Sequence, residues 1–340
     1  MKVALLMGGR SSEREISLKT GRGIAAALRS LGHDVTAVDA ADGVVLPAGD
    51  EEAGARPLAQ VQRLPLRAQV GVVDAPAVRE ADVVYNALHG AFGEDGRIQA
   101  LLELAGKRYT GSGVLASALA MNKAMSKRVF LHEGIPTPKW RLIAPARGET
   151  LGDEDAAGLG GYPLVVKPNE EGSTVGLTIV DGPEGLPGAV SLAARYWPEV
   201  LAEEYIPGRE LTVAVLGEEA LPVVEIRPKS GFYDYENKYT PGRTDYFCPA
   251  DLPAPLARRV LELGGHAARV LGCAGVCRVD FRLSPQQEPY CLEVNTIPGM
   301  TPTSLVPMAA RAVGMTYEDV VARALQLAMT GAGSAAGART

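Results

Sequence analysis

Two short aliphatic runs that each lead into a glycine-rich turn place the strongest constraint on the fold of this chain. Residues 2–7 (KVALLM) stop at Gly8-Gly9, and residues 82–88 (DVVYNAL) lead into a turn at 89–96 (HGAFGEDG). A helical pattern follows the first turn over residues 17–31. Strand, turn and helix in this order are typical of an open parallel α/β sheet, in which ligands lie beyond the carboxyl ends of the strands. We therefore expect both turns to face one binding site.

The length and the pattern of elements predict three units. With 340 residues the chain is longer than one average domain. We expect an N-terminal α/β domain at 1–118, α+β units at 119–206 and 207–330, and a flexible tail at 331–340. The pattern predicts helices at 117–133, 184–196, 254–271 and 316–329, and strands at 162–167, 177–180, 211–216, 221–227, 276–283 and 289–294.

Two segments interrupt this regular pattern. Residues 41–79 are rich in Ala, Gly, Pro and scattered charge, and 70–73 is the best strand candidate among them. Residues 229–247 are predicted to form a long polar loop. We interpret both segments as excursions from the compact units.

Composition excludes several classes of function. The 34 Lys and Arg residues against 40 Asp and Glu give a net charge of −6, which argues against a general binder of nucleic acid or anionic membranes. No run reaches the ~18–20 apolar residues of a membrane span. The four cysteines lack the spacing of a zinc site, so we expect reduced thiols. Because charged residues follow the first apolar run where a signal peptide needs small ones, we expect a cytoplasmic protein with no membrane partner.

The most specific pattern from the residues alone is a group of oxygen ligands near the C-terminus. Asp280 lies on one predicted strand, and Glu293 and Asn295 end the next. The i, i+2 spacing places Glu293 and Asn295 on one face, and Asp280 joins them if the two strands pair. Three oxygen ligands suit Mg²⁺ that bridges nucleotide phosphates. The alternative is a pair of exposed strand faces with ordinary salt bridges.

Two segments of the middle unit can serve a nucleotide. No Walker-type loop is present, but Lys167 ends a strand and leads into residues 168–176 (PNEEGSTVG), which offer backbone N–H groups and hydroxyls to phosphates. Residues 200–206 (VLAEEYI) combine a carboxylate, backbone hydrogen-bonding groups and an apolar ring neighbour, as an adenosine pocket requires. A solvated hairpin and an exposed linker are the respective alternatives.

In their joint order these residues resemble a known family. Lys123, Lys167 with its loop, residues 203–206, Asp280, Glu293 and Asn295 follow the order of ATP-grasp enzymes, which hold ATP between two α+β units. From Gly8 to about Met329 the chain resembles the D-alanine–D-alanine ligase family. The matching segments are 13–17 (EREIS), 88–90 (LHG), 93–96 (GEDG), 109–113 (YTGSG), 232–239 (FYDYENKY) and 293–304 (EVNTIPGMTPTS).

The resemblance implies both a fold and a reaction. The fold would be an N-terminal preATP-grasp domain with an open parallel sheet, followed by a two-part ATP-grasp fold. ATP would phosphorylate the carboxylate of one D-alanine, and the amino group of a second would attack the acyl phosphate to give D-alanyl-D-alanine, ADP and phosphate for peptidoglycan synthesis. The resemblance further implies two Mg²⁺ ions per site, with Mn²⁺ as an alternative, and a homodimer.

The resemblance also implies roles for individual residues. ATP contacts are expected from Lys123, Lys167, Lys238, Glu203, Glu204, Tyr205, Ile206, Glu210 and Asn295, and metal contacts from Asp280, Glu293 and Asn295. Glu15 would pair with the ammonium group of the first D-alanine, in a network with Ser173 and Tyr239 that ties the 229–247 lid over the site. Arg278 and the Gly299 N–H would face the oxyanion, Ser304 and the Leu305 N–H would hold the second carboxylate, and His89 would lie near the first amino acid.

Alternatives remain for several of these interpretations. Arg278 can instead be a structural partner of a neighbouring acid, and His89 a structural residue after a strand. Within the fold, another ATP-grasp amino-acid or dipeptide ligase would share the ATP site but differ in acceptor. A nucleotide-binding regulatory module would lack one of the metal-site acids. The Lys238-Tyr239 pair, which relatives that make the D-alanyl-D-lactate ester lack, favours an amine acceptor.

Overall fold

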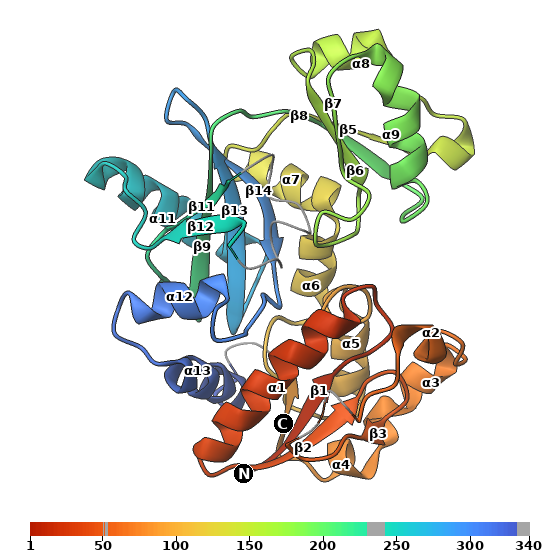
Figure 1. Cartoon of the computed structure of the whole chain (residues 1–340), viewed down its shortest axis with the longest axis vertical. Helices are drawn as coiled ribbons and strands as arrows, with labels where there is room; N and C mark the ends of the chain where they lie inside the picture. The colour runs from red at the N-terminus through yellow and green to blue at the C-terminus, as the bar shows by residue number, and fades with distance from the viewer. Residues whose placement is uncertain (50, 52–53, 230–241, 332–340) are drawn as a thin grey trace.

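The computed structural model describes residues 1–49, 51, 54–229 and 242–331, so the predicted tail lies almost wholly outside the described residues. Three sheets, each with its own helices, make up the chain (Figure 1). The sheet of the N-terminal region lies at the bottom of this view, the middle sheet at the upper right and the C-terminal sheet at the left. The mixed α/β fold class predicted from the sequence is confirmed.

The N-terminal sheet has the strand order β3-β2-β1-β4. Strands β1 (Lys2–Met7), β2 (Asp34–Asp39) and β4 (Val83–Asn86) are parallel, as predicted, and β3 (Val44–Val45) adds an antiparallel edge. Helix α1 (Arg14–Ser30) covers one face, and α5 (Arg97–Leu104) lies after the turn that follows β4. Both turns leave the carboxyl ends of adjacent strands, and Ser11 Oγ donates to the His89 carbonyl at 2.6 Å to join them.

The predicted strand at residues 70–73 is wrong. This segment ends helix α3 (Arg67–Val70) and forms the 3-10 helix η1 (Gly71–Asp74), between α2 (Leu58–Val61) and α4 (Pro76–Arg79). Val72 and Val78 are fully buried while Val70 is half exposed. Isolated valines therefore anchor short helical turns to the sheet.

The single helix predicted at 117–133 is two helices. Helix α6 (Val114–Met121) ends at Asn122, whose ψ of 96° breaks the helical path, and α7 (Lys123–His132) begins there. Asn122 caps α7, because its side-chain oxygen accepts from Met125 N at 3.0 Å. The break sets the direction of α7. It thereby also sets the position of the Lys123 side chain, because Lys123 is the first residue of that helix.

The middle sheet has the strand order β5-β8-β6-β7 and is antiparallel. Strands β5 (Trp140–Ile143), β6 (Leu164–Pro168), β7 (Thr178–Val180) and β8 (Val200–Glu204) bury one face under α8 (Asp153–Gly158) and α9 (Leu186–Ala193). Short 3-10 turns η2 (Pro145–Arg147) and η3 (Pro183–Gly185) precede these helices. The opposite face of β6 and β8 remains available to a ligand.

The C-terminal sheet carries the predicted strand pair. Its order is β12-β11-β9-β13-β14, and β10 (Glu219–Ala220) adds to β9 (Arg209–Leu216). Strand β12 (Thr244–Phe247) pairs with β11 (Val224–Pro228). The last residues of the predicted polar loop at 229–247 therefore form a strand. Strand β13 (Val276–Leu283) pairs with β14 (Pro289–Asn295), and α11 (Ala254–Val270) covers one face.

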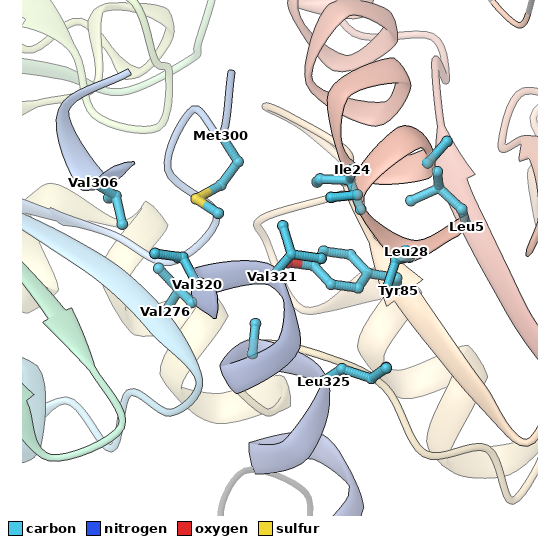
Figure 2. Close-up of a cluster of buried hydrophobic side chains, with 14 of the residues drawn as sticks. Leu5, Ile24, Leu28, Tyr85, Val276, Met300, Val306, Val320, Val321 and Leu325 are labelled. Carbon is cyan, nitrogen blue, oxygen red and sulfur yellow. The ribbon is translucent and has the colours of Figure 1, made fainter. Parts of the chain in front are cut away.

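The N-terminal and C-terminal regions share one hydrophobic core. Helix α12 (Leu305–Arg311) packs on the other face of the C-terminal sheet, and α13 (Tyr317–Met329) packs against α12, α1 and β4. Figure 2 shows Val321 and Leu325 of α13 beside Tyr85 of β4 and Leu28 of α1. Residues before and after the predicted boundary at residue 118 therefore belong to one continuous hydrophobic core.

This shared core gives a stability prediction. Leu325 is 2% exposed and Leu104 is 87% exposed. Leu325→Ala should lower the free energy of unfolding by about 3 kcal/mol, because it removes buried methyl groups and leaves a cavity between α13 and the N-terminal sheet. Leu104→Ala is the matched control and should change little. Urea denaturation measures both, and equal effects would contradict a core continuous across the boundary.

Candidate active site

Two cavities lie side by side between the three sheets. The first lies between the middle and C-terminal sheets, and the second between the N-terminal region and the C-terminal sheet. Both are lined by Gly172, Ser173 and Glu293, so they meet at this point. Groups bound in the two cavities can therefore approach each other beside Glu293.

The first cavity combines apolar walls with basic side chains. Its walls include Val165, Ile179, Tyr205, Ile206 and Leu292. A β-bulge places Leu292 there: Asp280 is opposite Glu293 but Phe281 is opposite Cys291, so Leu292 is the extra residue. Cys291 therefore faces the core while Leu292 and Glu293 both face the cavity. A flat aromatic base with a charged tail fits such a lining.

A buried carboxylate with two lysines lies in the wall of this cavity. Glu203 stands opposite Val165 on the neighbouring strand, so Lys167 is its diagonal neighbour on the same face. Lys167 Nζ lies 2.7 Å from Glu203 Oε2, and Lys127 Nζ lies 3.0 Å from Oε1. Burial alone would raise the pKa of Glu203, but the two lysines hold it below its usual value. The carboxylate is therefore ionised and acceptor-only.

Lys127 was not predicted from the sequence. The available signal is its i, i+4 spacing from Lys123, which places both side chains on one face of α7. Lys123 Nζ lies 3.3 Å from Glu293 and donates to the Glu171 carbonyl at 2.6 Å. Lys123 and Lys167 thus line the first cavity, and the buried Lys127 lies behind its wall, against Glu203.

Glu204 and Glu210, which were also predicted to contact ATP, line the first cavity, whereas Asn295 lines the second. The Glu204 side chain accepts a long hydrogen bond from Lys139 N at 3.4 Å. Glu210 Oε2 lies 3.6 Å from Arg282 Nη1, and Arg282 donates to the Ile206 carbonyl. Arg282 was not predicted, although it follows Asp280 at i+2 on the same face of β13. Lys238 lies outside the described residues.

The predicted oxygen ligands lie together. Asp280 and Glu293 are cross-strand partners, and Asn295 is two residues further along β14. Arg278 donates two hydrogen bonds to Asp280, at 2.9 and 2.8 Å, and Thr212 donates a third at 2.6 Å. Within the described chain no group of three His, Cys, Asp or Glu side chains could hold a metal. The donor set is two carboxylates and an amide, hard oxygens of the kind that Mg²⁺ takes with water and phosphate.

Of the two glutamates at the start of α1, Glu13 lines the second cavity and the predicted Glu15 does not. Glu13 is 8% exposed, lines the cavity and accepts from Ser173 Oγ at 2.5 Å. Glu15 lies in the first turn of α1 with an exposed side chain, and the residues that line the cavity do not include it.

Close packing fixes the position of Glu13. A Cβ atom on Gly90 or Gly172 would lie 2.8 or 2.9 Å from Glu13 Oε2, so a side chain at either position would displace this carboxylate. Next to it, the fully buried Arg14 binds Asp39 through both Nη atoms at 3.0 and 2.6 Å and donates to the Gly9 carbonyl. The turn after β1 is thus tied to the end of β2.

A histidine–carboxylate pair forms the floor beside Glu13. His89 Nδ1 lies 3.3 Å from Glu94 Oε1, and its Nε2 lies 3.1 Å from Thr20 Oγ1. Burial raises the pKa of Glu94, and the nearby Glu13 carboxylate raises it further, although the His89 hydrogen bond opposes this. Both ring nitrogens of His89 therefore have partners, as expected for a structural histidine. His89 also lines the second cavity, as expected for a residue near a substrate.

The predicted oxyanion and acceptor residues line the same cavity. These are Arg278, Gly299, Ser304 and Leu305. Arg278 fits both of its predicted roles. It is the structural partner of Asp280, and it also faces the cavity, where it can reach an oxyanion. Ser304 Oγ accepts from Thr301 N at 3.0 Å, which ties the turn before α12. Tyr239 lies outside the described residues.

Comparisons with known proteins agree with this geometry. Residues 2–112 match the family model described as D-ala D-ala ligase N-terminus, and 129–326 match D-ala D-ala ligase C-terminus. A D-alanine–D-alanine ligase of Geobacter sulfurreducens is 46% identical, covering 95% of this chain and 93% of the relative. One of Moorella thermoacetica is 44% identical, covering 97% and 99%.

Solved structures lead to the same family. A D-alanine–D-alanine ligase from Bacillus anthracis complexed with ATP has a TM-score of 0.78 and 30% identity, covering 98% of both chains. VanG D-Ala:D-Ser ligase from Enterococcus faecalis has a TM-score of 0.76 and 28% identity, covering 96% of this chain and 98% of its own. Two α+β units around a basic, partly apolar cavity define an ATP-grasp enzyme. The chain belongs to the D-alanine–D-alanine ligase family of ATP-dependent enzymes.

The raised pKa of Glu94 predicts a pH dependence of stability. An unfolded Glu releases its proton near pH 4.3, whereas folded Glu94 holds it to higher pH. The folded state therefore binds more protons in this window, and stability falls as pH rises through it. Glu94→Gln should reduce this fall, measured by urea denaturation between about pH 4 and 8. Glu262→Gln, on the exposed side of α11, should keep the native slope. An unchanged slope for Glu94→Gln would contradict the assignment.

Proposed function

We propose that the two cavities are halves of one active site that joins two D-alanine molecules at the expense of ATP. A carboxylate oxygen of the first D-alanine takes the γ-phosphoryl group of ATP and ADP leaves. The amino group of the second then forms the C–N bond, the C–O bond to phosphate breaks, and the amine gives up a proton. The observation that carries the proposal is the shared wall at Gly172, Ser173 and Glu293, since phosphoryl donor and carboxylate must meet there.

The first cavity would hold ATP. Tyr205, Ile206 and Leu292 would contact the adenine, with Glu203 and Glu204 in the same wall, and Glu210 would contact the ribose. Lys123 and Lys167, joined by Lys238 of the lid, would contact the phosphates. Ammonium groups at fixed positions neutralise charge that moves between phosphates in the transition state.

The oxygen ligands would hold two Mg²⁺ ions, or Mn²⁺ in their place. Asp280, Glu293 and Asn295 supply hard donors, and two of these already carry cationic partners, Arg278 and Lys123. When bound, such ions neutralise the polyphosphate and orient it. The residues themselves keep the carboxylates side by side through the β13–β14 register.

The second cavity would hold the two amino acids. Glu13, fixed by Ser173, would accept from the first ammonium group, with His89 beside it and Tyr239 completing the network from the lid. Arg278 and Gly299 N–H would stabilise the oxyanion of the tetrahedral intermediate. Ser304 and Leu305 N–H would bind the second carboxylate. A closed lid would exclude water, which otherwise hydrolyses the acyl phosphate.

Identification of the product shows whether the enzyme uses D-alanine or another compound as its second substrate. The enzyme should form D-alanyl-D-alanine from ATP, Mg²⁺ and D-alanine, and excess EDTA should abolish this. The amount of D-alanyl-D-alanine is compared with the amount of product formed when D-serine or D-lactate is offered as the second substrate, because a D-Ala:D-Ser ligase has a similar fold. Mass spectrometry of the products at about pH 7 gives the answer. Comparable D-lactate incorporation would refute an amine acceptor, and no stimulation of phosphate release by D-alanine would refute the proposed function.

The cellular setting is part of the proposal. The dipeptide would serve peptidoglycan precursor synthesis in the cytoplasm, and the enzyme would act as a homodimer. None of the helices in the described part of the chain is long and apolar enough to cross a membrane. Sedimentation equilibrium tests the dimer, and a monomer at micromolar concentration would contradict it.

A matched pair of variants tests the assignment of Glu13. Glu13→Gln should raise the KM for the first D-alanine by about tenfold or more, because it removes the charge that pairs with the ammonium group. Glu15→Gln should leave KM and kcat near their native values, since Glu15 is exposed. Steady-state phosphate release measures both. The reverse pattern would restore the assignment to Glu15.

A further inference from the structure

Lys127 is a buried charge that the proposed reaction does not use. Its side chain is fully buried on α7, and the cavity lining does not include it. Its ammonium group contacts Glu203 Oε1, Thr137 Oγ1 at 2.8 Å and the Pro138 carbonyl at 3.3 Å. It also lies 5.6 Å from the centre of the Trp140 ring. A lysine so enclosed is costly to bury, and its position calls for an explanation.

The two lysines on Glu203 differ in their freedom to move. Lys127 is held by a hydroxyl and a carbonyl in addition to Glu203, and Thr137 in turn donates to the Cys291 carbonyl at 2.8 Å. Lys167 lines the first cavity, and its ion pair there is with Glu203. Lys127 can therefore stay in place while Lys167 turns toward a ligand.

The charge balance explains why two lysines are present. A buried carboxylate that loses its only cationic partner pays a large desolvation cost, so a single lysine would stay bound to it. With Lys127 fixed on Oε1, Glu203 stays paired when Lys167 leaves Oε2. The freed oxygen can then accept a hydrogen bond from a donor in the cavity, since an ionised carboxylate has several acceptor positions.

We propose that Lys127 is a positioning residue for ATP: it neutralises Glu203 permanently, which releases Lys167 to the phosphates. This inference rests on the proposed function only in taking ATP as the ligand of the first cavity. Lys127 itself touches no substrate. Its effect passes through Glu203 to Lys167.

The test separates phosphate binding from base binding. Lys127→Met keeps the length and apolar volume of the side chain but removes the charge. It should weaken binding of the non-hydrolysable analogue AMP-PNP with Mg²⁺ by about tenfold, the loss of roughly one charge-assisted hydrogen bond. Binding of adenosine, which has no phosphate, should stay within about twofold. Isothermal titration calorimetry measures the binding of AMP-PNP, and ligand-observed NMR measures the binding of adenosine. The KM for D-alanine should stay near its native value.

A second variant tests the charge argument directly. If Lys127 acts by neutralising Glu203, then in a Glu203→Gln background the change Lys127→Met should no longer weaken AMP-PNP binding, because Lys167 is free in both. This comparison needs only the AMP-PNP affinities of E203Q and of the double variant K127M/E203Q, so it stands even if K127M alone does not fold. Lys107→Met, a partly exposed lysine bound to backbone carbonyls, is the control.

Three results would overturn the proposal. They are equal loss of adenosine and AMP-PNP binding in K127M, native AMP-PNP binding in K127M, and further weakening by K127M in the E203Q background. Failure of the proposed function has a different signature, since native protein would then make no dipeptide whatever the nucleotide affinities of the variants.

Discussion

The antiparallel pairing of β13 with β14 is the constraint on which the site depends. Its register sets Asp280 against Glu293, and the bulge at Leu292 turns an apolar side chain and a carboxylate toward the same side. Without the bulge, strict alternation would place Glu293 on the face of Cys291, in the core. Because Glu293 also forms the boundary between the two cavities, one irregular residue in a strand determines where they meet.

The second cavity depends on contacts between distant parts of the sequence. Glu13 reaches Ser173 of the middle unit, while α13 at the end of the chain packs on α1 and β4. The continuous core in Figure 2 holds the N-terminal sheet against the C-terminal one. The buried Arg14–Asp39 pair then fixes the turn that carries Glu13. The loop at 172–173 belongs to both cavities, so the middle unit contributes to each.

Charge is balanced locally throughout the cleft. Lys123 pairs with Glu293, Arg278 with Asp280, and Lys127 and Lys167 share Glu203. The overall charge of −6 has no bearing on this arrangement. In a site of low dielectric each cation needs a nearby anion until a phosphate replaces it. Preorganised cations of this kind suit phosphoryl transfer, in which positioning and charge stabilisation provide most of the catalysis.

The residues alone determined the strand–turn–helix opening, the strand pair with its acids, and the absence of a Walker loop, because strand periodicity and turn residues are local properties. The resemblance supplied most roles in the site. Only the tertiary structure decided that Glu13 rather than Glu15 enters the cavity, since the start of α1 sets which side chain points inward. It also decided that residues 70–73 are helical, that Asn122 divides a helix, and that Lys127 belongs to the Glu203 cluster. These depend on which surfaces meet in space: the i, i+4 spacing places Lys127 on the same helix face as Lys123, but it does not say which group that face meets.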